Sequence, residues 1–180
     1  SFPGEALGCV MNIFRRSEIE PGQTVAIVGV GFIGTVLTAL AVQAGARVIA
    51  ITRRPFALEL AEQYGAQVRI RLDDPARALG EAQRIVGDAG CERVIEAIGT
   101  QQGLDLASAL AGVRARLVIA GYHQDGSRQI DMQSWNWRGL DVINAHERDP
   151  AQYLRGMQEA VDLVASGRFD PSPLYTHQFA

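Results

Sequence analysis

Short runs of β-branched and other apolar residues alternate along the chain with amphipathic stretches of helical period. This alternation is typical of βαβ units, in which each helix leads back to the next parallel strand. Most of the runs are nearly continuous in Val, Ile and Ala, which indicates strands covered on both faces of a sheet. The pattern therefore predicts an α/β fold: a doubly wound, mostly parallel six-stranded sheet with helices on both faces. The predicted strands are Thr24–Val30, Arg47–Thr52, Gln67–Leu72, Arg93–Ile98, Arg116–Gly121 and Leu140–Ala145.

Helical periodicity fills the intervals between these runs. The first crossover helix carries apolar residues from Ile33 to Leu40 and stops at Gly45, because glycine is a favourable C-terminal cap. The second begins at Pro55, which suits a first helical position, and ends at Gly65. Further helices are predicted over residues 5–16, 75–86, 104–110 and 153–164.

Residues 122–139 break this rhythm with a polar, glycine-containing turn that is followed by two tryptophans, Trp135 and Trp137. Burying both against the edge of the sheet is one explanation, and a subunit interface, where Trp is enriched, is the other. We expect residues 128–145 to lie at a sheet edge, where an unpaired strand favours a homodimer with two-fold symmetry.

A complete G-x-G-x-x-G motif, GVGFIG at positions 29–34, follows the first predicted strand and opens a helix. Gly29 permits a tight turn, Gly31 leaves room for a pyrophosphate, and Gly34 allows the helix to pack closely on the strand. The amide groups of the first helical turn, from Phe32 and Ile33, would face the phosphates together with the positive end of the helix dipole. In this strand–turn–helix context the motif predicts a dinucleotide-binding Rossmann sheet. The alternative is that the three glycines serve only a tight turn.

The end of the second strand bears on which dinucleotide is bound. An NAD site carries Asp or Glu there to accept hydrogen bonds from the ribose, but this chain has Thr52, Arg53 and Arg54 and no acid between Arg47 and Phe56. Arginine can meet the oxygens of a 2′-phosphate in a bidentate fork. The residues therefore predict that NADP(H) is preferred over NAD(H), and they argue against an S-adenosylmethionine site. The alternative is that the arginines lie on a solvated turn.

The remaining site residues follow from topology, because a doubly wound sheet binds its ligand across the carboxyl ends of the strands. This edge nominates the ends of the fourth, fifth and sixth strands for the nicotinamide half of a cofactor. The nominated cofactor-binding residues are Ala97, Ile98, Gly99, Gly121, Tyr122 and Ala145, with Thr100 and His146 beside them.

Composition narrows the chemistry. All 17 basic residues are arginine, so a Walker-type phosphate loop, a Schiff-base enzyme and a Tyr-x-x-x-Lys reductase are excluded, since each needs a lysine. The formal charge of −3 and the scattered arginines do not indicate nucleic-acid binding. Neither a membrane-length apolar run nor a signal peptide is recognisable, so we expect a soluble, cytoplasmic protein.

No catalytic constellation is visible among the titratable residues. Cys9 and Cys91 lie far apart without a CxxC pair, and we expect both to be buried apolar residues. His123, His146 and His177 share no metal-ligand spacing, and each is expected to be structural or at the surface. We therefore assign neither catalytic residues nor metal ligands within this chain.

Several spaced segments resemble one family, the zinc-type medium-chain alcohol and polyol dehydrogenases, in the domain that binds the coenzyme. They are the glycine motif and the segments EALGC at 5–9, PGQTV at 21–25, YGA at 64–66 and RVIEAIG at 93–99. The resemblance implies that residues 1–180 form one dinucleotide-binding domain of a larger enzyme, whose GroES-like domain binds the catalytic zinc and lies outside this chain. The first residue, Ser1, and the end after residues 175–179 agree with a domain separated from such an enzyme.

In the polyol branch of that family, a glutamate that begins an E-P-L run lies beside the zinc. Glu5 matches this position, although Ala6 replaces the proline. The family's cysteine and His-Glu zinc ligands have no counterpart here, so zinc is expected in the parent enzyme and not in this chain. Thr52 in place of an acid departs from the NAD-using polyol enzymes.

These observations lead to an NADP(H)-binding domain that positions the nicotinamide for hydride transfer to or from an alcohol or carbonyl substrate, which the missing domain would hold. The isolated chain is then expected to bind coenzyme without turnover. Two alternatives stay open: a non-catalytic NAD(P)-binding regulatory or redox-sensing module, and a zinc-free quinone-reductase-like member of the same family.

Overall fold

The computed structural model describes residues 4–175 and contains one six-stranded sheet. The strands lie in the order β3-β2-β1-β4-β5-β6, and every adjacent pair is parallel. The doubly wound sheet predicted from the sequence is confirmed, and it is parallel throughout. The strands are β1 (Thr24–Val28), β2 (Arg47–Thr52), β3 (Val68–Arg71), β4 (Cys91–Glu96), β5 (Ala111–Ile119) and β6 (Asp141–Asn144).

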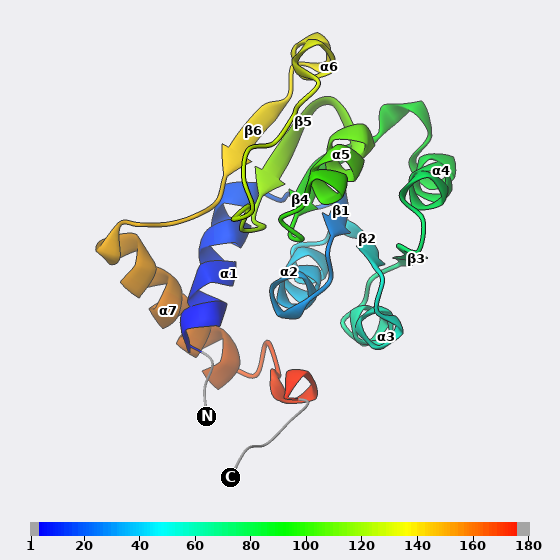
Figure 1. Ribbon diagram of the computed structural model, residues 1–180. Helices are drawn as coiled ribbons and strands as arrows, with labels where there is room; N and C mark the ends of the chain where they lie inside the picture. The colour runs from blue at the N-terminus through cyan, green and yellow to red at the C-terminus, as the bar shows by residue number, and fades with distance from the viewer. Residues whose placement is uncertain (1–3, 176–180) are drawn as a thin grey trace.

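Helices cover both faces of this sheet (Figure 1). The α-helices are α1 (Gly4–Ser17), α2 (Phe32–Gln43), α3 (Pro55–Gln63), α4 (Pro75–Val86), α5 (Gln101–Leu110), α6 (Met132–Arg138) and α7 (Pro150–Ala165). Two short 3-10 helices, η1 (Gly87–Ala89) and η2 (Ser172–Leu174), complete the described elements. None of the helices among residues 4–175 is both long and apolar enough to cross a membrane.

The period-two alternation of strand side chains divides the core into two layers. Val25 and Ile27 of β1 join a cluster with buried residues of α1, α2, α3 and α7. Ala26 and Val28, which alternate with them, join a second cluster with residues of α4 and α5. Apolar residues on both faces of the central strands are therefore buried, as the continuous Val, Ile and Ala runs predicted.

The helices at the two ends of the described chain, α1 and α7, lie side by side (Figure 1). Glycines allow the close approach, because a Cβ on Gly156 would lie 2.6 Å from the carbonyl oxygen of Gly8. Arg15 of α1 also donates to Glu159 of α7 at 2.9 Å. Asn12 is a buried residue of α1, and its side-chain amide donates to the carbonyl oxygen of Ala145 at 2.8 Å. This contact fixes the end of β6 against α1.

Most predicted elements differ from the structure by one to three residues at an end, as in β1, which ends at Val28 rather than Val30, and β4, which spans Cys91–Glu96 rather than Arg93–Ile98. Two segments differ more. β5 begins at Ala111 rather than at Arg116. Its pairing with β4 shifts register between Cys91 and Arg93, so the first half of the strand is irregular and was not recognised in the sequence. Residues 132–138, predicted as irregular, form α6. Asp131 caps this helix by accepting from the backbone of Ser134, and Gly139 ends it in the left-handed conformation.

Candidate functional site

Three cavities follow the carboxyl ends of the strands, where a doubly wound sheet binds its ligand. The β2-side cavity, of about 230 Å³, is lined by Gly29, Val30, Gly31, Thr52, Arg53, Arg54, Leu72, Ala97 and Ile98. A smaller neighbour of about 150 Å³ shares Arg53, Leu72 and Ile98 with it and extends to Thr100 and Gly103. The β5-side cavity, of about 280 Å³, lies beyond the glycine turn and is lined by Ile33, Gly121, Tyr122, Ala145, His146 and residues of α1 and α7.

These cavities bring together most of the cofactor-binding residues that the sequence nominated. Seven of the 14 line the β2-side cavity, and four more, Ile33, Gly121, Tyr122 and Ala145, line the β5-side cavity. The remaining three, Phe32, Gly34 and Gly99, line none of the three cavities. Gly34 and Gly99 are buried and support the backbone turns that shape the site.

The glycine turn joins β1 to α2 with the geometry expected from its motif. Gly29 has a φ of +105°, which side chains rarely tolerate, and its amide donates to the carbonyl oxygen of Ile51 at 2.9 Å. A Cβ on Gly34 would overlap the carbonyl oxygen of Gly29, so only glycine lets α2 begin this close to the turn. The roles predicted for these two glycines are confirmed.

The start of α2 directly follows the Gly29–Gly31 turn that lines the β2-side cavity, and it has no competing cap. Its N-cap residue is Gly31, which offers no side-chain hydrogen bond, and no acidic residue lies in the first helical turn. A helix with this start has free amide donors and the positive end of its dipole available to an anion. A Cβ added at Gly31 would lie 3.2 Å from Nη2 of Arg54, so the guanidinium group of Arg54 reaches over the glycine turn.

The end of β2 supplies the positive charge of the same cavity. Thr52 is buried, with 6% of its surface exposed, whereas Arg53 and Arg54 are exposed and precede α3. Arg53 lines both the β2-side cavity and its smaller neighbour. None of the residues that line the β2-side cavity is an acid. The β2-side cavity therefore suits an anionic group, because two guanidinium groups line it without a carboxylate. Asp73, which lines the smaller neighbour with Arg53, forms an ion pair with Arg71.

The β5-side cavity has a different character. Tyr153 of α7 donates to Oε1 of Glu5 at 2.7 Å, and the thiol of Cys9 approaches the same oxygen at 3.5 Å. The hydrogen bond to Glu5 raises the pKa of the Tyr153 hydroxyl. Burial, and after it the charge of Glu5, raises the pKa of Cys9. The terminal helices thus place one carboxylate, one phenol and one thiol beside the ends of β5 and β6.

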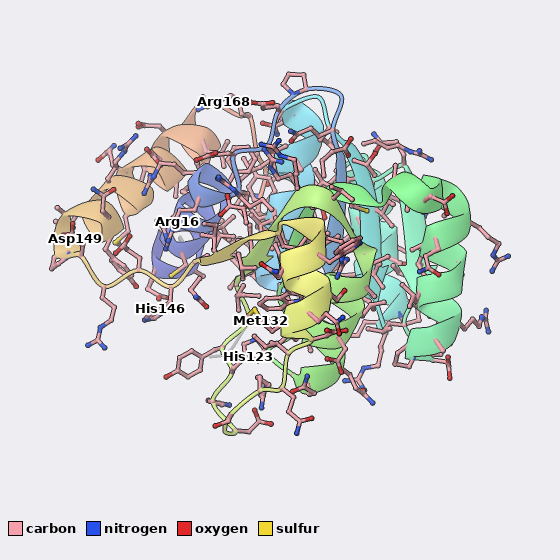
Figure 2. The ribbon with its side chains drawn as sticks, turned by 90° about the horizontal axis from the view of Figure 1, so that it is seen from above. Arg16, His123, Met132, His146, Asp149 and Arg168 are labelled. Atoms are coloured by element: carbon pink, nitrogen blue, oxygen red, sulfur yellow. The ribbon has the colours of Figure 1, made fainter. Side chains whose placement is uncertain are left out.

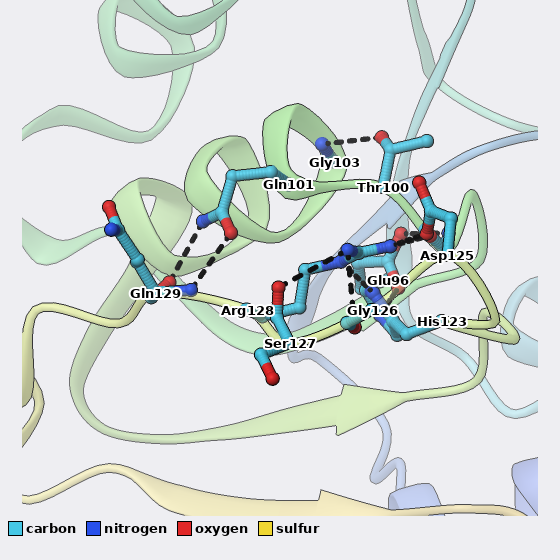
Figure 3. A network of polar contacts seen from close by, with 11 residues as sticks. Glu96, Thr100, Gln101, Gly103, His123, Asp125, Gly126, Ser127, Arg128 and Gln129 are labelled. Carbon is cyan, nitrogen blue, oxygen red and sulfur yellow. Dashed lines mark hydrogen bonds and ion pairs between the residues drawn. The ribbon is translucent and has the colours of Figure 1, made fainter.

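Sequence reasoning missed a network of polar side chains between the β2-side and β5-side cavities (Figure 3). Its centre is Glu96, the last residue of β4, whose side chain is fully buried and accepts from His123 at 3.0 Å. His123 accepts in turn from Arg128, which also forms an ion pair with Asp125. The hydrogen bond from Arg128 lowers the pKa of Asp125. A glutamate inside the apolar run of β4 is the sequence signal that could have indicated such a network, since a buried charge requires partners.

The histidines and cysteines of the described residues differ in burial and in surroundings. His123 is partly buried in the network around Glu96, His146 is exposed on the segment that joins β6 to α7, and both are labelled in Figure 2. His177 lies outside the described residues. Cys91 is buried, and burial raises the pKa of its thiol to about 12. The prediction for Cys9 was wrong in degree, because it is only half-buried where it lines the β5-side cavity.

A metal site is a separate question. Within residues 4–175, no three side chains of His, Cys, Asp or Glu are arranged to hold a metal ion. Glu5, the residue matched to the zinc neighbourhood, has Cys9 and Tyr153 as its polar contacts. The described residues therefore do not fit a zinc site of their own.

Comparison with known proteins places this geometry in context. Residues 33–166 match the family model for zinc-binding dehydrogenases. Sorbitol dehydrogenase of Bacillus subtilis is 30% identical over 170 residues, which are 92% of this chain and 45% of that enzyme. The 2-dehydro-3-deoxy-L-galactonate 5-dehydrogenase of Pseudoalteromonas atlantica is 27% identical over 169 residues, 94% of this chain and 48% of that enzyme.

A solved structure agrees with both. A zinc-binding dehydrogenase from Sinorhizobium meliloti 1021, bound to NADP, matches with a TM-score of 0.78 and 30% identity, covering 93% of this chain and 48% of that one. The chain thus spans about half the length of the curated relatives it matches.

Proposed function

The chain belongs to the zinc-binding dehydrogenase family, and on that premise we propose that it binds NADP(H) across the carboxyl edge of its sheet. The observation that carries the proposal is the β2-side cavity, where an uncapped helix start and two arginines meet without an acid. The free amides of α2 suit a pyrophosphate. Arg53 suits a 2′-phosphate, because it lines both this cavity and its smaller neighbour, where an adenosine would lie.

The described residues have distinct tasks in this proposal. Gly31 adds no side chain at the approach to α2, and the guanidinium group of Arg54, which reaches over the turn, adds a positive charge there. Ile33, Gly121 and Tyr122 form the wall of the β5-side cavity, which would receive the nicotinamide half. When bound, the cofactor supplies or accepts the hydride, and the chain contributes binding and orientation.

At the level of a whole enzyme, we propose a dehydrogenase or reductase acting on an alcohol or carbonyl compound. The relatives named above act on polyols and sugar acids, and the structural relative is bound to NADP. Residues 1–180 would be the coenzyme domain, and a second domain would hold the substrate. A homodimer and a cytoplasmic location stay predictions.

The proposal is tested by titrating wild-type chain and Arg53→Ala with NADPH and NADH. The wild type should bind NADPH more tightly than NADH. Losing a hydrogen bond to a charged group costs about 1.5–3 kcal/mol, so Arg53→Ala should weaken NADPH binding roughly 10-fold to 150-fold. NADH affinity should change little, because NADH carries no 2′-phosphate.

Arg77→Ala is the matched control, because it removes an exposed arginine of α4 that lines none of the three cavities. It should leave both affinities unchanged. Equal affinities of the wild type for NADPH and NADH would refute the preference, and failure to bind either would refute the nucleotide site itself.

A second candidate is a regulatory or redox-sensing module that binds NAD(P) without chemistry. The lack of a metal-binding group among residues 4–175 is consistent with such a module, as it is with a coenzyme domain whose zinc is held by another domain. Finding sequence for a zinc-binding β domain next to this chain in its gene would argue against such a module. A gene that encodes no such domain would favour it.

A further inference from the structure

One buried carboxylate joins the two loops that separate the cavities. Oε1 of Glu96 accepts from the amides of Ile98 and Gly99, at 2.8 and 2.7 Å, and so shapes the turn that follows β4. Oε2 accepts from Nε2 of His123 at 3.0 Å, in the loop that follows β5. Glu96 is fully buried, so these three donors replace the water that an ionised carboxylate would otherwise need.

The tautomer of His123 follows from its second partner. Nε of Arg128 lies 2.8 Å from Nδ1 of His123. A guanidinium group can only donate, so Nδ1 must accept, and the single ring proton resides on Nε2, where it is donated to Glu96. Arg128 also donates to the carbonyl oxygen of Gly99 at 3.0 Å. Glu96, His123 and Arg128 therefore close a ring of contacts through both loops (Figure 3).

The backbone around this ring has little freedom to shift. A Cβ on Gly121 would lie 2.6 Å from Oε2 of Glu96 and 2.7 Å from the Cα of Gly99. Further along the loop, Gln101 donates to the carbonyl oxygen of Gln129 at 2.8 Å and accepts from the amide of Gln129 at 2.9 Å. The loop after β5 is thus attached to the start of α5 as well as to Glu96.

The attached loop carries part of the wall of the β5-side cavity. Gly121 and Tyr122 line that cavity and directly precede His123, whose side chain points away from it toward Glu96. Tyr122 is 72% exposed, and its ring lies 6.2 Å from that of His146, so its own side chain contributes little to fixing the wall. The amide of Gly121 donates to the carbonyl oxygen of Glu96 at 2.8 Å, which holds the start of the wall. The position of the wall at Tyr122 depends in addition on how His123 is held.

We propose that His123, held between Glu96 and Arg128, is a positioning residue that sets the wall of the β5-side cavity for the nicotinamide half of the coenzyme. The inference rests on the proposed function. In this arrangement, two separate groups of residues hold the two halves of the coenzyme. The glycine turn and the arginines hold the adenosine half, and the ring of Glu96, His123 and Arg128 positions the wall for the nicotinamide half.

Two ligands and two matched variants test this division. NADPH fills both halves of the site, whereas adenosine 2′,5′-bisphosphate has no nicotinamide. Asparagine at position 123 keeps an acceptor near Nδ1 for Arg128 but loses the donor to Glu96. Glutamine places an amide N–H near Nε2 and keeps that donor. His123→Asn should weaken NADPH binding by up to about tenfold, because binding must then order a wall that the lost hydrogen bond no longer holds, and the cost of one hydrogen bond to a charged group sets the upper bound.

The same variant should change the affinity for adenosine 2′,5′-bisphosphate by less than about twofold, and His123→Gln should restore most of the NADPH affinity. The fluorescence of bound NADPH, which reports the surroundings of the reduced nicotinamide, should shift in His123→Asn and return in His123→Gln. Thermal melting of each variant checks that it is folded. If His123→Asn does not fold, Arg128→Met replaces it, because it leaves His123 in place and removes its second partner.

Three results would overturn the inference: unchanged NADPH affinity in His123→Asn, equal weakening of both ligands, or no difference between the Asn and Gln variants. The proposed function fails separately, if wild-type chain binds neither NADPH nor adenosine 2′,5′-bisphosphate.

Discussion

Alanine at two helical glycines should change stability in opposite directions. Gly34 lies in α2 and Gly80 in α4. Alanine is favoured over glycine inside a helix by about 1 kcal/mol, so both variants gain that contribution. They differ in what the added methyl group meets, which makes Gly80→Ala a matched control for Gly34→Ala.

At Gly34 the new Cβ would overlap the carbonyl oxygen of Gly29, and the carbonyl carbon of Gly29 would lie only 3.0 Å away. Backbone atoms cannot rotate aside as a side chain can, so α2 must move away from the glycine turn. Overpacking of this kind costs about 1–3 kcal/mol, and a backbone overlap belongs at the upper end. After the helix gain, we expect Gly34→Ala to lose about 2 kcal/mol. At Gly80 nothing lies within 4 Å, so the gain of about 1 kcal/mol should remain.

Urea unfolding followed by far-ultraviolet circular dichroism measures both changes, with a common slope fitted to wild type and variants. The two variants should differ by about 3 kcal/mol in the free energy of unfolding. NADPH affinity should fall in Gly34→Ala and stay unchanged in Gly80→Ala. If Gly34→Ala is as stable as Gly80→Ala, the inferred close packing of α2 against the turn is wrong.

Three further predictions concern other parts of the molecule. The folded state binds the Cys91 proton more tightly than the unfolded chain, since its pKa rises from 9.0 to about 12. The stabilising contribution of the protonated Cys91 thiol is therefore complete below about pH 9 and is lost as the pH rises toward 12, by up to about 1.4 kcal/mol per pH unit. In urea unfolding, the free energy of unfolding of Cys91→Ala should fall less steeply than that of the wild type between about pH 9 and pH 12. Trp137 is 88% exposed on α6, the helix that directly precedes the edge strand β6 in the chain. The wild type should therefore sediment as a dimer at high micromolar concentration and Trp137→Ser as a monomer; a monomeric wild type would contradict this. The purified chain should oxidise NADPH with no member of an aldehyde and ketone panel and should hold no stoichiometric zinc by elemental analysis, whereas steady turnover with bound zinc would show that it is a complete enzyme.

Much of the fold was predictable because its strands are short, apolar and buried on both faces. β2 matches its predicted bounds, and α4 begins and ends at Pro75 and Val86 as predicted. The errors occur where local sequence and tertiary structure disagree. The first half of β5 carries Gly112 and exposed Arg114, with φ of +58°, so it lacks an apolar run. α6 depends on its Asp131 cap and on Trp135, whose indole donates to Ser108 of α5.

Trp135 and Trp137 show why the sequence left two explanations open for residues 122–139: packing against the sheet edge, and a subunit interface. Trp135 packs against the second core cluster, as the sheet-edge explanation requires. Trp137, two residues later on a helix, points elsewhere and is exposed. A seven-residue helix was not recognised in the sequence, so the opposite environments of the two side chains could not be predicted.

The two halves of the candidate site differ in how far the sequence reveals them. The glycine turn and the end of β2 act through backbone geometry and a local run of arginines, so their positions follow from neighbours along the chain. Glu96 and His123 are 27 residues apart, and their contact depends on how the loop after β5 folds back over β4. The sequence still contains a warning, since a glutamate in the run Val94–Ile98 would be costly to bury without donors. A buried charge at the carboxyl end of a parallel strand is therefore a reason to look for the loop that covers it, and here that loop is a wall of the cavity proposed for the nicotinamide. We accordingly expect substitutions at Arg53 to change which cofactor is preferred, and substitutions at His123 to change how its nicotinamide half is held.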